Sequence, residues 1–361
     1  MREGVLVHGA TGFTGKLVCG ALRKRGLSFA IGGRSQEKLD ALSRALGGVE
    51  TSLIDIRSSD SIRAGLEGRT VVCACAGPFV DVGEPILASC ARMGIHYADT
   101  TGEQLFVAQA VSRYRATAEA SGACMVPSLA YEIAPADWGA HEAAKRLGGA
   151  PDDISILYVI DSKSGYGAGT SQGTKQSALR MIAAGDAKQF IDGALRLESV
   201  GKTVKAFSLR SGRRVTGASF PSPESVVVSS HTGANNVRTF MAMGKGAARA
   251  LSVTKGLLPY VARFGNGLLT RVIARSTGGP KGEARDAAFE ILIEARRGTS
   301  CVRVFVTGRD PYGLTAEIQA LYAARALAGT LESRGVVAPS KAINAADAFA
   351  ALPELTMHVE D

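Results

Sequence analysis

The feature that most constrains this fold is a glycine-rich turn close to the N-terminus. A short apolar run leads into three glycines spaced three residues apart: Val5-Leu6-Val7-His8-Gly9-Ala10-Thr11-Gly12-Phe13-Thr14-Gly15. A helical pattern follows over residues 16–25. Strand, tight turn and helix in this order form the first unit of a dinucleotide-binding fold. Glycine is frequent here (43 of 361 residues), so the pattern alone also fits an ordinary glycine-rich loop.

Each position in the turn has a physical role in binding a dinucleotide. Gly9 allows the sharp turn, Gly12 lets the backbone approach a pyrophosphate, and Gly15 lets the helix pack close to the strand. The pyrophosphate then meets the unsatisfied N–H groups and positive dipole of the helix N-terminus. The predicted cofactor contacts in this turn are Gly9, Thr11, Gly12, Phe13, Thr14 and Gly15.

The residues after the second predicted strand, 28–33, indicate which dinucleotide binds. An NAD site usually has an Asp or Glu at this point, whereas this chain has Arg34, Ser35 and Lys38. A guanidinium binds phosphate oxygens in a bidentate way, so these cations suit the 2′-phosphate of NADP. The alternative is that Arg34 and Lys38 are solvated charges at the start of a helix.

Strands and helices alternate through the first 125 residues, which indicates a parallel sheet. Further strands are predicted at 49–54, 70–76, 96–99 and 123–126, with helices at 58–66 and 84–93. Asp55 follows the third strand and either reaches the adenine or caps the next helix. Ligands bind at the carboxyl ends of such strands. The turn after the fourth strand should therefore lie beside the nicotinamide, through Ala76, Gly77, Pro78 and Phe79.

The pattern changes after residue 137, near Trp138, and the length of 361 residues favours two domains. Strands of one largely antiparallel sheet are predicted at 154–160, Ser225–Ser229, 288–295 and 300–307. Helices are predicted at Gln172–Ala184, Gly244–Ala274, 314–328 and 345–352.

Charge is concentrated in one part of the second half. Residues 202–281 contain thirteen Lys or Arg and a single acid, Glu224, so this segment is +12 in a chain of net charge +9. There is no nucleic-acid recognition motif, and we expect no nucleic-acid partner. An anionic substrate, a carrier such as coenzyme A or acyl carrier protein, or a membrane surface explains the bias better.

The remaining composition indicates the compartment. No run is long and apolar enough to cross a bilayer, and the chain enters a strand within a few residues, so neither a signal peptide nor a transmembrane helix is expected. The six cysteines are scattered, and Cys73 and Cys75 have neither zinc nor Cys-x-x-Cys spacing. These features predict a cytoplasmic protein with reduced cysteines.

Peripheral membrane contact is an alternative carried by residues 244–276. Apolar side chains recur there on one face of a predicted helix, whose remainder is rich in Lys and Arg: Leu257, Val261, Phe264, Leu268 and Val272. Such a helix packs within its own domain or across a dimer, or it lies in a membrane interface.

The sequence identifies the residue that transfers the proton less clearly than it identifies the cofactor site. None of the eight tyrosines has Lys four residues later, which excludes the Tyr-x-x-x-Lys arrangement of short-chain dehydrogenases. Cys124 and Cys301 lie in predicted strands, so neither is expected to be a catalytic nucleophile. Tyr131 follows the last strand of the first domain, and its hydroxyl could protonate a carbanion or a nitrogen. The alternative is that Tyr131 is a buried structural residue.

Other polar residues near the strand ends have simpler explanations. Asp99 and Glu103 lie near the end of the fifth strand and would fix loops, and Asp137 would cap the next helix. His8 should pack within the first strand, and His231 lies in the basic segment, where it has a chance of touching substrate. No histidine or cysteine cluster predicts a metal site.

Four motifs together resemble the saccharopine dehydrogenase-like NADP-binding reductases, nearest the branch of trans-acting enoyl reductases. They are Gly-Ala-Thr-Gly-Phe-Thr-Gly (9–15), Gly-Arg-Ser-x-x-Lys-Leu (33–39), Ala-Gly-Pro-Phe (76–79) and His-Tyr-x-Asp-x-Thr-Gly-Glu (96–103). Gly173-Thr174 and the run from Gly308 to Ala316 also look like that branch. One departure is Ala130-Tyr131-Glu132, where members commonly have Gly-Phe-Asp.

The resemblance implies an α/β fold with a Rossmann NADP-binding domain at 1–137 and a substrate and dimerisation domain of mixed α/β type at 138–313. It also implies that the C-terminal helices, about 314–361, pack back on the first domain, and that the chain forms a homodimer. The expected activity is NADPH-dependent hydride transfer to an activated C=C bond of a polyketide- or lipid-like intermediate, either small or carrier-bound. Reduction of a C=N bond and a catalytically silent NADP sensor are the alternatives.

Overall fold

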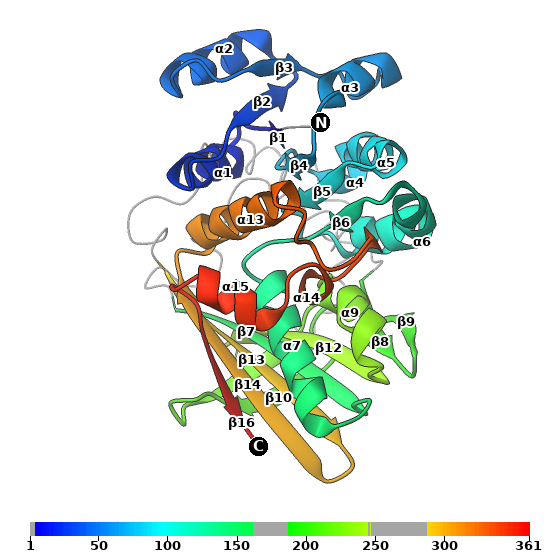
Figure 1. The fold of residues 1–361 in the computed structure, drawn as a ribbon. Coiled ribbons are helices and arrows are strands. Elements are labelled where there is room, and N and C mark those ends of the chain that lie inside the picture. The colour runs from blue at the N-terminus through cyan, green and yellow to red at the C-terminus, as the bar shows by residue number, and fades with distance from the viewer. Residues whose placement is uncertain (1–3, 162–186, 245, 247–286) are drawn as a thin grey trace. The chain divides into compact units, whose positions relative to one another are not determined.

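A computed structural model describes residues 4–161, 187–244, 246 and 287–361 (Figure 1). It divides the chain into two compact units. The first unit contains the residues up to Thr101, Leu105–Ala134 and Tyr312–Leu352, and the second contains Gly102–Gln104, Pro135–Pro311 and Pro353–Asp361. The first unit is therefore assembled from segments at both ends of the sequence.

The first unit is built on a parallel sheet of seven strands. Their order is β15-β6-β5-β4-β1-β2-β3, so the chain leaves β3 at one edge and returns on the far side of β1. This reversal between β1 and β4 is the topological switch point of a doubly wound fold. The strands are β1 Val5–His8, β2 Phe29–Gly33, β3 Thr51–Leu53, β4 Val71–Ala74, β5 His96–Asp99, β6 Cys124–Val126 and β15 Gly335–Val336.

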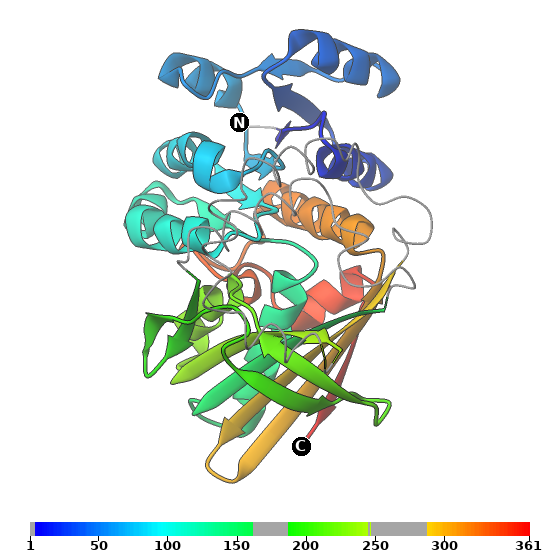
Figure 2. The same cartoon turned by 180° about the vertical axis from the view of Figure 1, so that it is seen from behind.

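Helices cover both faces of this sheet, with α1, α2 and α13 on one face and α3, α5 and α6 on the other (Figures 1 and 2). The inner strands are almost continuously buried, as two-sided coverage requires, whereas the edge strand β3 is only partly covered. The helices are α1 Phe13–Lys24, α2 Gln36–Ala45, α3 Ser59–Leu66, α4 Phe79–Val82, α5 Glu84–Met93, α6 Gln104–Ser121, α13 Pro311–Leu327, α14 Pro339–Ala342 and α15 Ala345–Ala351.

Helix α13 is joined to the sheet by buried side-chain hydrogen bonds. The amide of Gln319 donates to the carbonyls of Asp99 and Leu129, at 3.0 and 2.8 Å, and the hydroxyl of Tyr322 donates to the carbonyl of Cys124 at 2.6 Å. Both side chains are completely buried. Because a buried carbonyl left without a donor is costly, α13 is an integral part of the first unit.

The second unit contains a mixed, largely antiparallel sheet with β10-β11-β12-β7-β13-β14-β16 as its main path and β8 and β9 at one side. Only the β12–β7 pair is parallel among the pairs described. The strands are β7 Asp153–Asp161, β8 Lys188–Ile191, β9 Ala194–Leu197, β10 Val204–Ser208, β11 Arg214–Ser219, β12 Asn236–Met243, β13 Ala288–Arg297, β14 Ser300–Arg309 and β16 Thr356–Glu360.

The two faces of the second sheet are covered differently. Helix α7 (Ile133–Leu147) packs on one face, where a β-carbon at Gly139 would lie 2.7 Å from the terminal methyl group of Ile293, so glycine suits this close approach. The opposite face has a core of its own, formed by Leu157, Val159, Phe207, Leu209, Phe240, Leu292 and Phe305.

The fold class predicted from sequence is confirmed, with two corrections. Ser225–Ser229 is helical, not a strand, because α9 (Glu224–Val227) and α10 (Ser229–Thr232) occupy this region and the hydroxyls of Ser229, Ser230 and Thr232 bond to carbonyls three or four residues earlier. The predicted return of residues 314–361 to the first domain is wrong for Thr356–Glu360, because β16 pairs with β14 of the second sheet.

Two further expectations concern helices. The predicted helix Gln172–Ala184 and almost all of the predicted helix Gly244–Ala274 lie outside the described residues, as does the apolar face of residues 257–272. Among the helices that the structure does describe, none is both long enough and apolar enough to cross a bilayer.

A buried carboxylate connects three strands of the second sheet. Glu294 of β13 is 5% exposed and lies 2.8 Å from the amine of Lys205 and 3.2 Å from the guanidinium of Arg303. Burial alone would raise the pKa of Glu294, but hydrogen bonds from Lys205 and Arg303 lower it overall. The charged form of this carboxylate is therefore the one that the folded state favours.

Glu294→Gln should lower the free energy of unfolding at pH 7 by about 1–3 kcal/mol, because two cations lose a charged partner. The folded pKa lies below the unfolded value of about 4.3, so the stabilisation is present above that pH and is lost as the pH falls through the folded pKa. Urea unfolding from pH 3 to 8 measures it. Glu360→Gln, at the register position of Arg303 in β16, is the control, and an equal effect of both variants would contradict the assignment.

Candidate functional site

The glycine turn after β1 lies against the turn after β4, at the switch point of the sheet. Gly9 has a φ of +79°, and a β-carbon there would lie 2.7 Å from the amide nitrogen of Ala76. Gly9 follows β1 and Ala76 follows β4, so the loops after these strands are in backbone contact. This close approach requires glycine at position 9 and places two predicted cofactor residues together.

The start of α1 is shaped to receive an anion. A β-carbon at Gly15 would lie 2.4 Å from the carbonyl oxygen of Gly9, so glycine alone lets the helix begin this close to the turn. Gly12 precedes the helix as its N-cap residue and is exposed, no side chain caps the helix, and its first turn holds no acid. The first N–H groups of α1 therefore remain available for a pyrophosphate.

An aromatic contact links this turn to helix α13 of the same unit. The rings of Phe13 and Tyr312 meet edge to face, with centroids 5.2 Å apart. Thr11, Phe13 and Thr14 are all partly exposed around the turn. Tyr312 was not predicted as a site residue. The sequence feature that pointed to Tyr312 was its place in the run from Gly308 to Ala316, which resembles the reductase family.

The predicted 2′-phosphate residues lie together at the end of β2. Arg34 and Lys38 are exposed, and Ser35 is the N-cap residue of α2 but its side chain makes no capping hydrogen bond. Two cations, a hydroxyl and a helix N-terminus therefore occur within five residues of sequence. This set of groups fits a phosphate dianion.

Asp55 belongs to a local ion pair at the end of β3. Its carboxylate accepts hydrogen bonds from the backbone and guanidinium of Arg57, and these bonds lower the pKa of Asp55 to about 2. The expectation that Asp55 caps the next helix is wrong, because the hydroxyl of Ser58 accepts from the amide of Ser61. Ser58 is closer to the helix and has the geometry of an N-cap.

The turn after β4 presents mainly backbone. Gly77 is exposed, Ala76 and Pro78 are half-buried, and Gly77–Pro78 is a cis peptide. The side chain of Phe79 is instead 5% exposed and packs against Phe106, with ring centroids 5.6 Å apart. Phe79 therefore anchors the turn through its ring, and contact with a nicotinamide would come from the backbone of residues 76–78.

Tyr131 lies half-buried in the loop after β6, and hydrogen bonds fix its backbone. Its amide donates to the hydroxyl of Thr315 on α13 at 3.1 Å. Earlier in the loop Ser128 has a φ of +63°, and the carboxylate of Asp99 accepts from its amide and from that of Thr101, both at 2.9 Å. Asp99 thus fixes loops, as predicted. Thr315 is a further supporting residue that sequence reasoning missed.

Asp137 and His231, two polar residues considered in the sequence, lie in the interior of the second unit. Asp137 is fully buried inside α7, where it pairs with His231 at 2.6 Å. The expectation that Asp137 caps a helix is therefore wrong, because α7 begins four residues earlier, at Ile133. The side chain of His231 is 4% exposed and packs beside His141, so it has no open surface for a substrate.

In the first unit, His8 is buried in β1, and burial lowers its pKa to about 4.

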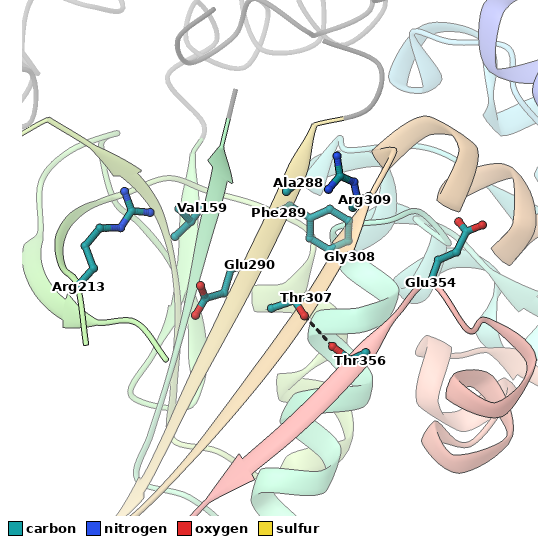
Figure 3. Close-up of a pocket in the computed structure, with 10 residues that line it drawn as sticks. All are labelled: Val159, Arg213, Ala288, Phe289, Glu290, Thr307, Gly308, Arg309, Glu354 and Thr356. Atoms are coloured by element: carbon teal, nitrogen blue, oxygen red, sulfur yellow. Dashed lines mark hydrogen bonds between the residues drawn. The ribbon is translucent and has the colours of Figure 1, made fainter. Parts of the chain in front are cut away.

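A cavity of about 380 Å³ opens on the second sheet, on the face opposite α7 (Figure 3). Thr307 and Thr356 bond to each other across β14 and β16 at 2.7 Å, and two arginines and two glutamates surround them. Its lining residues are Val159, Arg213, Ala288, Phe289, Glu290, Thr307, Gly308, Arg309, Glu354 and Thr356. Arg213 belongs to the basic segment noted in the sequence.

Metal chemistry receives no support from the described part of the chain. No group of three or more His, Cys, Asp or Glu residues lies close enough together there to hold an ion. The thiols of Cys19, Cys73, Cys90 and Cys124 have pKa values raised by burial. Buried neutral thiols are poor nucleophiles and poor ligands.

Comparison with known proteins supports the cofactor assignment. Residues 5–126 match the family model described as the saccharopine dehydrogenase NADP binding domain. The family resemblance and the NADP(H) cofactor predicted from the motifs are therefore confirmed for this part of the chain.

Curated relatives match part of the chain. A trans-acting enoyl reductase of Mycobacterium leprae is 32% identical over 149 residues, which are 40% of this chain and 36% of that protein. A trans-acting enoyl reductase of Mycobacterium tuberculosis is 30% identical over 148 residues, 39% and 35% of the two chains. The chain spans less than half the length of these relatives, and 42% of a further Mycobacterium tuberculosis protein named putative trans-acting enoyl reductase.

The fold extends further than the sequence similarity. Apo saccharopine dehydrogenase (L-Glu forming) from Saccharomyces cerevisiae superposes with a TM-score of 0.61, covering 99% of this chain and 100% of that one at 13% identity. Identity this low shows a shared fold, and it carries no statement about substrate.

Gly9→Ala should weaken NADPH binding at least about tenfold, because the new methyl group meets Ala76 and strains a residue of positive φ by about 1–3 kcal/mol. Titration of NADPH fluorescence measures it. Gly20→Ala in α1, where a β-carbon meets nothing within 4 Å, is the matched control and should bind normally. Unchanged binding by Gly9→Ala would show that the turn does not form the pocket.

Proposed function

We propose that this chain, whose residues 5–126 form a saccharopine dehydrogenase NADP-binding domain, is an NADPH-dependent reductase of an activated C=C bond. The observation that carries the proposal is the backbone contact between Gly9 and Ala76 at the switch point of the parallel sheet. It lies beside an uncapped helix start and in the same unit as Arg34 and Lys38. Reductase-named relatives support the same class of reaction.

The residues of the first unit divide the task of holding the cofactor. The N–H groups at the start of α1 would hold the pyrophosphate, and Arg34, Ser35 and Lys38 the 2′-phosphate. The backbone of residues 76–78 would lie against the nicotinamide end. When bound, NADPH supplies a hydride, and the protein has to orient the acceptor and provide a proton.

Tyr131 is the proposed proton donor. Hydride addition to the β-carbon of an enone or enoyl thioester moves the π-electron pair toward the carbonyl, and the resulting enolate takes a proton at its α-carbon. Tyr131 follows β6 at the carboxyl edge of the sheet, and its amide bond to Thr315 holds the loop in place. A phenol can give up a proton at this step and recover it from solvent.

The substrate class rests on the relatives and on charge. The relatives are named trans-acting enoyl reductases, and the +12 segment 202–281 suits an anionic or carrier-bound acyl group. A polyketide- or lipid-like intermediate combines both properties. A panel of enones and imines, followed by NADPH oxidation, separates C=C from C=N reduction, and tight binding with no oxidation would favour a silent NADP sensor.

Assembly and location remain predictions. We propose a homodimer located in the cytoplasm, with peripheral membrane contact through residues 244–276 as a separate possibility. Light scattering of the purified protein tests the dimer. Flotation with liposomes tests the membrane contact, and a Leu257/Phe264/Leu268 triple Asp variant is its control.

Arg34→Ala combined with Lys38→Ala should weaken NADPH binding about 10–100-fold and leave NADH binding unchanged, because charge-assisted bonds to the 2′-phosphate are worth about 1.5–3 kcal/mol. Fluorescence titration with both cofactors measures it. Arg44→Ala, an exposed cation in the last turn of α2, should bind both cofactors normally. An equal loss for NADH and NADPH would place these cations away from the 2′-phosphate.

Tyr131→Phe should lower kcat about 10²–10⁴-fold and leave the Kd for NADPH unchanged, because only the proton is lost. The measurement is NADPH oxidation with the best acceptor from the enone panel. Tyr114→Phe, which removes a half-buried hydroxyl bonded to Glu84 in the same unit, is the control. A Tyr131→Phe variant with wild-type kcat would remove Tyr131 from the mechanism and leave the cofactor assignment intact.

A further inference from the structure

The turn between β10 and β11 carries a concentration of positive charge. Residues 208–214, called the hairpin tip below, read Ser-Leu-Arg-Ser-Gly-Arg-Arg. Arg210, Arg213 and Arg214 are all exposed. No Asp or Glu occurs between residues 202 and 219, which include both strands of the hairpin. The hairpin tip therefore presents three guanidinium groups with no acidic residue beside them in the sequence.

These guanidinium groups are not engaged by the described part of the chain. None of the three forms an ion pair or a side-chain hydrogen bond with a described residue. Other arginines of the second unit are engaged, since Arg238 lies 3.7 Å from Glu198 and Arg303 lies 3.2 Å from Glu294. Like charges close together repel one another within a folded chain. A partner with negative charge would relieve this repulsion at the hairpin tip.

Two acidic residues lie in the cavity beside the hairpin tip without pairing with its arginines. Glu290 and Glu354 line the cavity that Arg213 also lines (Figure 3), and neither forms an ion pair with Arg213. One carboxylate oxygen of Glu290 instead accepts a hydrogen bond from the backbone amide of Arg210 at 3.1 Å. Glu290 thus holds the backbone of the hairpin tip to β13 and leaves the guanidinium groups exposed.

The backbone of the hairpin tip is fixed even though its charged side chains are exposed. Leu209 is 3% exposed and belongs to the apolar core of this face of the sheet. Its carbonyl accepts a hydrogen bond from the amide of Gly212 at 2.9 Å, and its amide donates to the carbonyl of Arg213 at 3.0 Å. A surface whose backbone is already ordered loses less conformational entropy when a partner binds.

The chemistry of the hairpin tip favours an acidic protein surface over a membrane or a nucleic acid. Leu209 is its single apolar side chain and is buried, so the hairpin tip has nothing to insert into a lipid interface. It contains no aromatic residue on which a base could stack, and Phe207 before it is 2% exposed. Guanidinium groups bind carboxylates in a bidentate way. Clustered Asp and Glu side chains therefore fit it best.

We propose that the hairpin tip docks an acidic carrier protein that presents the acyl substrate. The inference rests on the proposed function, whose acyl acceptor is either small or carrier-bound, and it selects the carrier-bound form. Carboxylates of the carrier pair with Arg210, Arg213 and Arg214, which speeds the encounter and fixes the orientation of the carrier. Because these pairs are exposed to solvent, salt screens them and weakens docking.

The test measures association of the full-length chain with immobilised holo acyl carrier protein by surface plasmon resonance, from about 0.05 to 0.5 M sodium chloride. Binding by wild type should weaken as salt rises. The variant Arg210→Glu/Arg213→Glu/Arg214→Glu should associate about 10–100-fold more slowly at low salt, because electrostatic steering is lost. The control is Arg23→Glu/Arg44→Glu/Arg115→Glu, which makes the same change of charge at exposed arginines of the first unit and should associate nearly as wild type does.

A second variant covers the case in which three glutamates prevent folding. Arg210→Gln/Arg213→Gln/Arg214→Gln keeps polar side chains of similar length, and it should slow association in the same direction by a smaller factor. The Kd for NADPH should be unchanged in every variant, because the hairpin tip contributes nothing to the cofactor site. This measurement also shows that the first unit is folded.

Two results would overturn the docking surface: no binding of the carrier by wild type, or equal losses in the hairpin-tip and control variants. Binding to phosphatidylglycerol vesicles or to single-stranded DNA in place of the carrier would overturn it in favour of those partners. The reductase is tested separately. A chain that docks the carrier through the hairpin tip but oxidises no NADPH would contradict the proposed activity alone, and one that reduces free enones but binds no carrier would contradict the docking surface alone.

Discussion

The backbone contact between the turns after β1 and β4 is the constraint on which the first unit depends. A β-carbon at Gly9 or at Gly15 would meet main-chain atoms at 2.7 and 2.4 Å, so neither position tolerates a side chain without movement of the backbone. The N-cap residue of α1 is Gly12, and no side chain caps the helix start. The absence of side chains at Gly9 and Gly15 thus allows the turns after β1 and β4 and the start of α1 to lie this close together.

Helix α13 fixes the loops after β5 and β6 and contacts the turn after β1. It bonds to the carbonyls of Asp99 and Leu129 through Gln319 and to the amide of Tyr131 through Thr315, and its Tyr312 meets Phe13. The loops at the carboxyl ends of β5 and β6 are therefore held by residues 184 to 220 positions away in sequence. This explains why a nucleotide-binding unit recruits the last part of the chain.

Charge is used differently in the two halves of the second unit. Lys205 and Arg303 hold Glu294 in its ionised form between strands, whereas burial raises the pKa of Glu224 in α9, with a smaller contribution from Asp137. The two glutamates are both buried and differ in the sign of their neighbours. Opposite dependences of stability on pH follow, because the two cations outweigh desolvation at Glu294, whereas desolvation outweighs the hydrogen bonds to Glu224.

The sequence by itself determined the local features: the glycine turn, the strands that are continuous apolar runs, the cations of 34–38 and the NADP cofactor. These depend on the order of neighbouring residues, which fixes backbone freedom and charge within a few positions. Only the tertiary structure decided the rest. Val226, Val227 and Val228 read as a strand and form helix because burial between other elements overrides propensity. Asp137 meets His231 ninety-four residues away, and no local pattern encodes a partner at that separation.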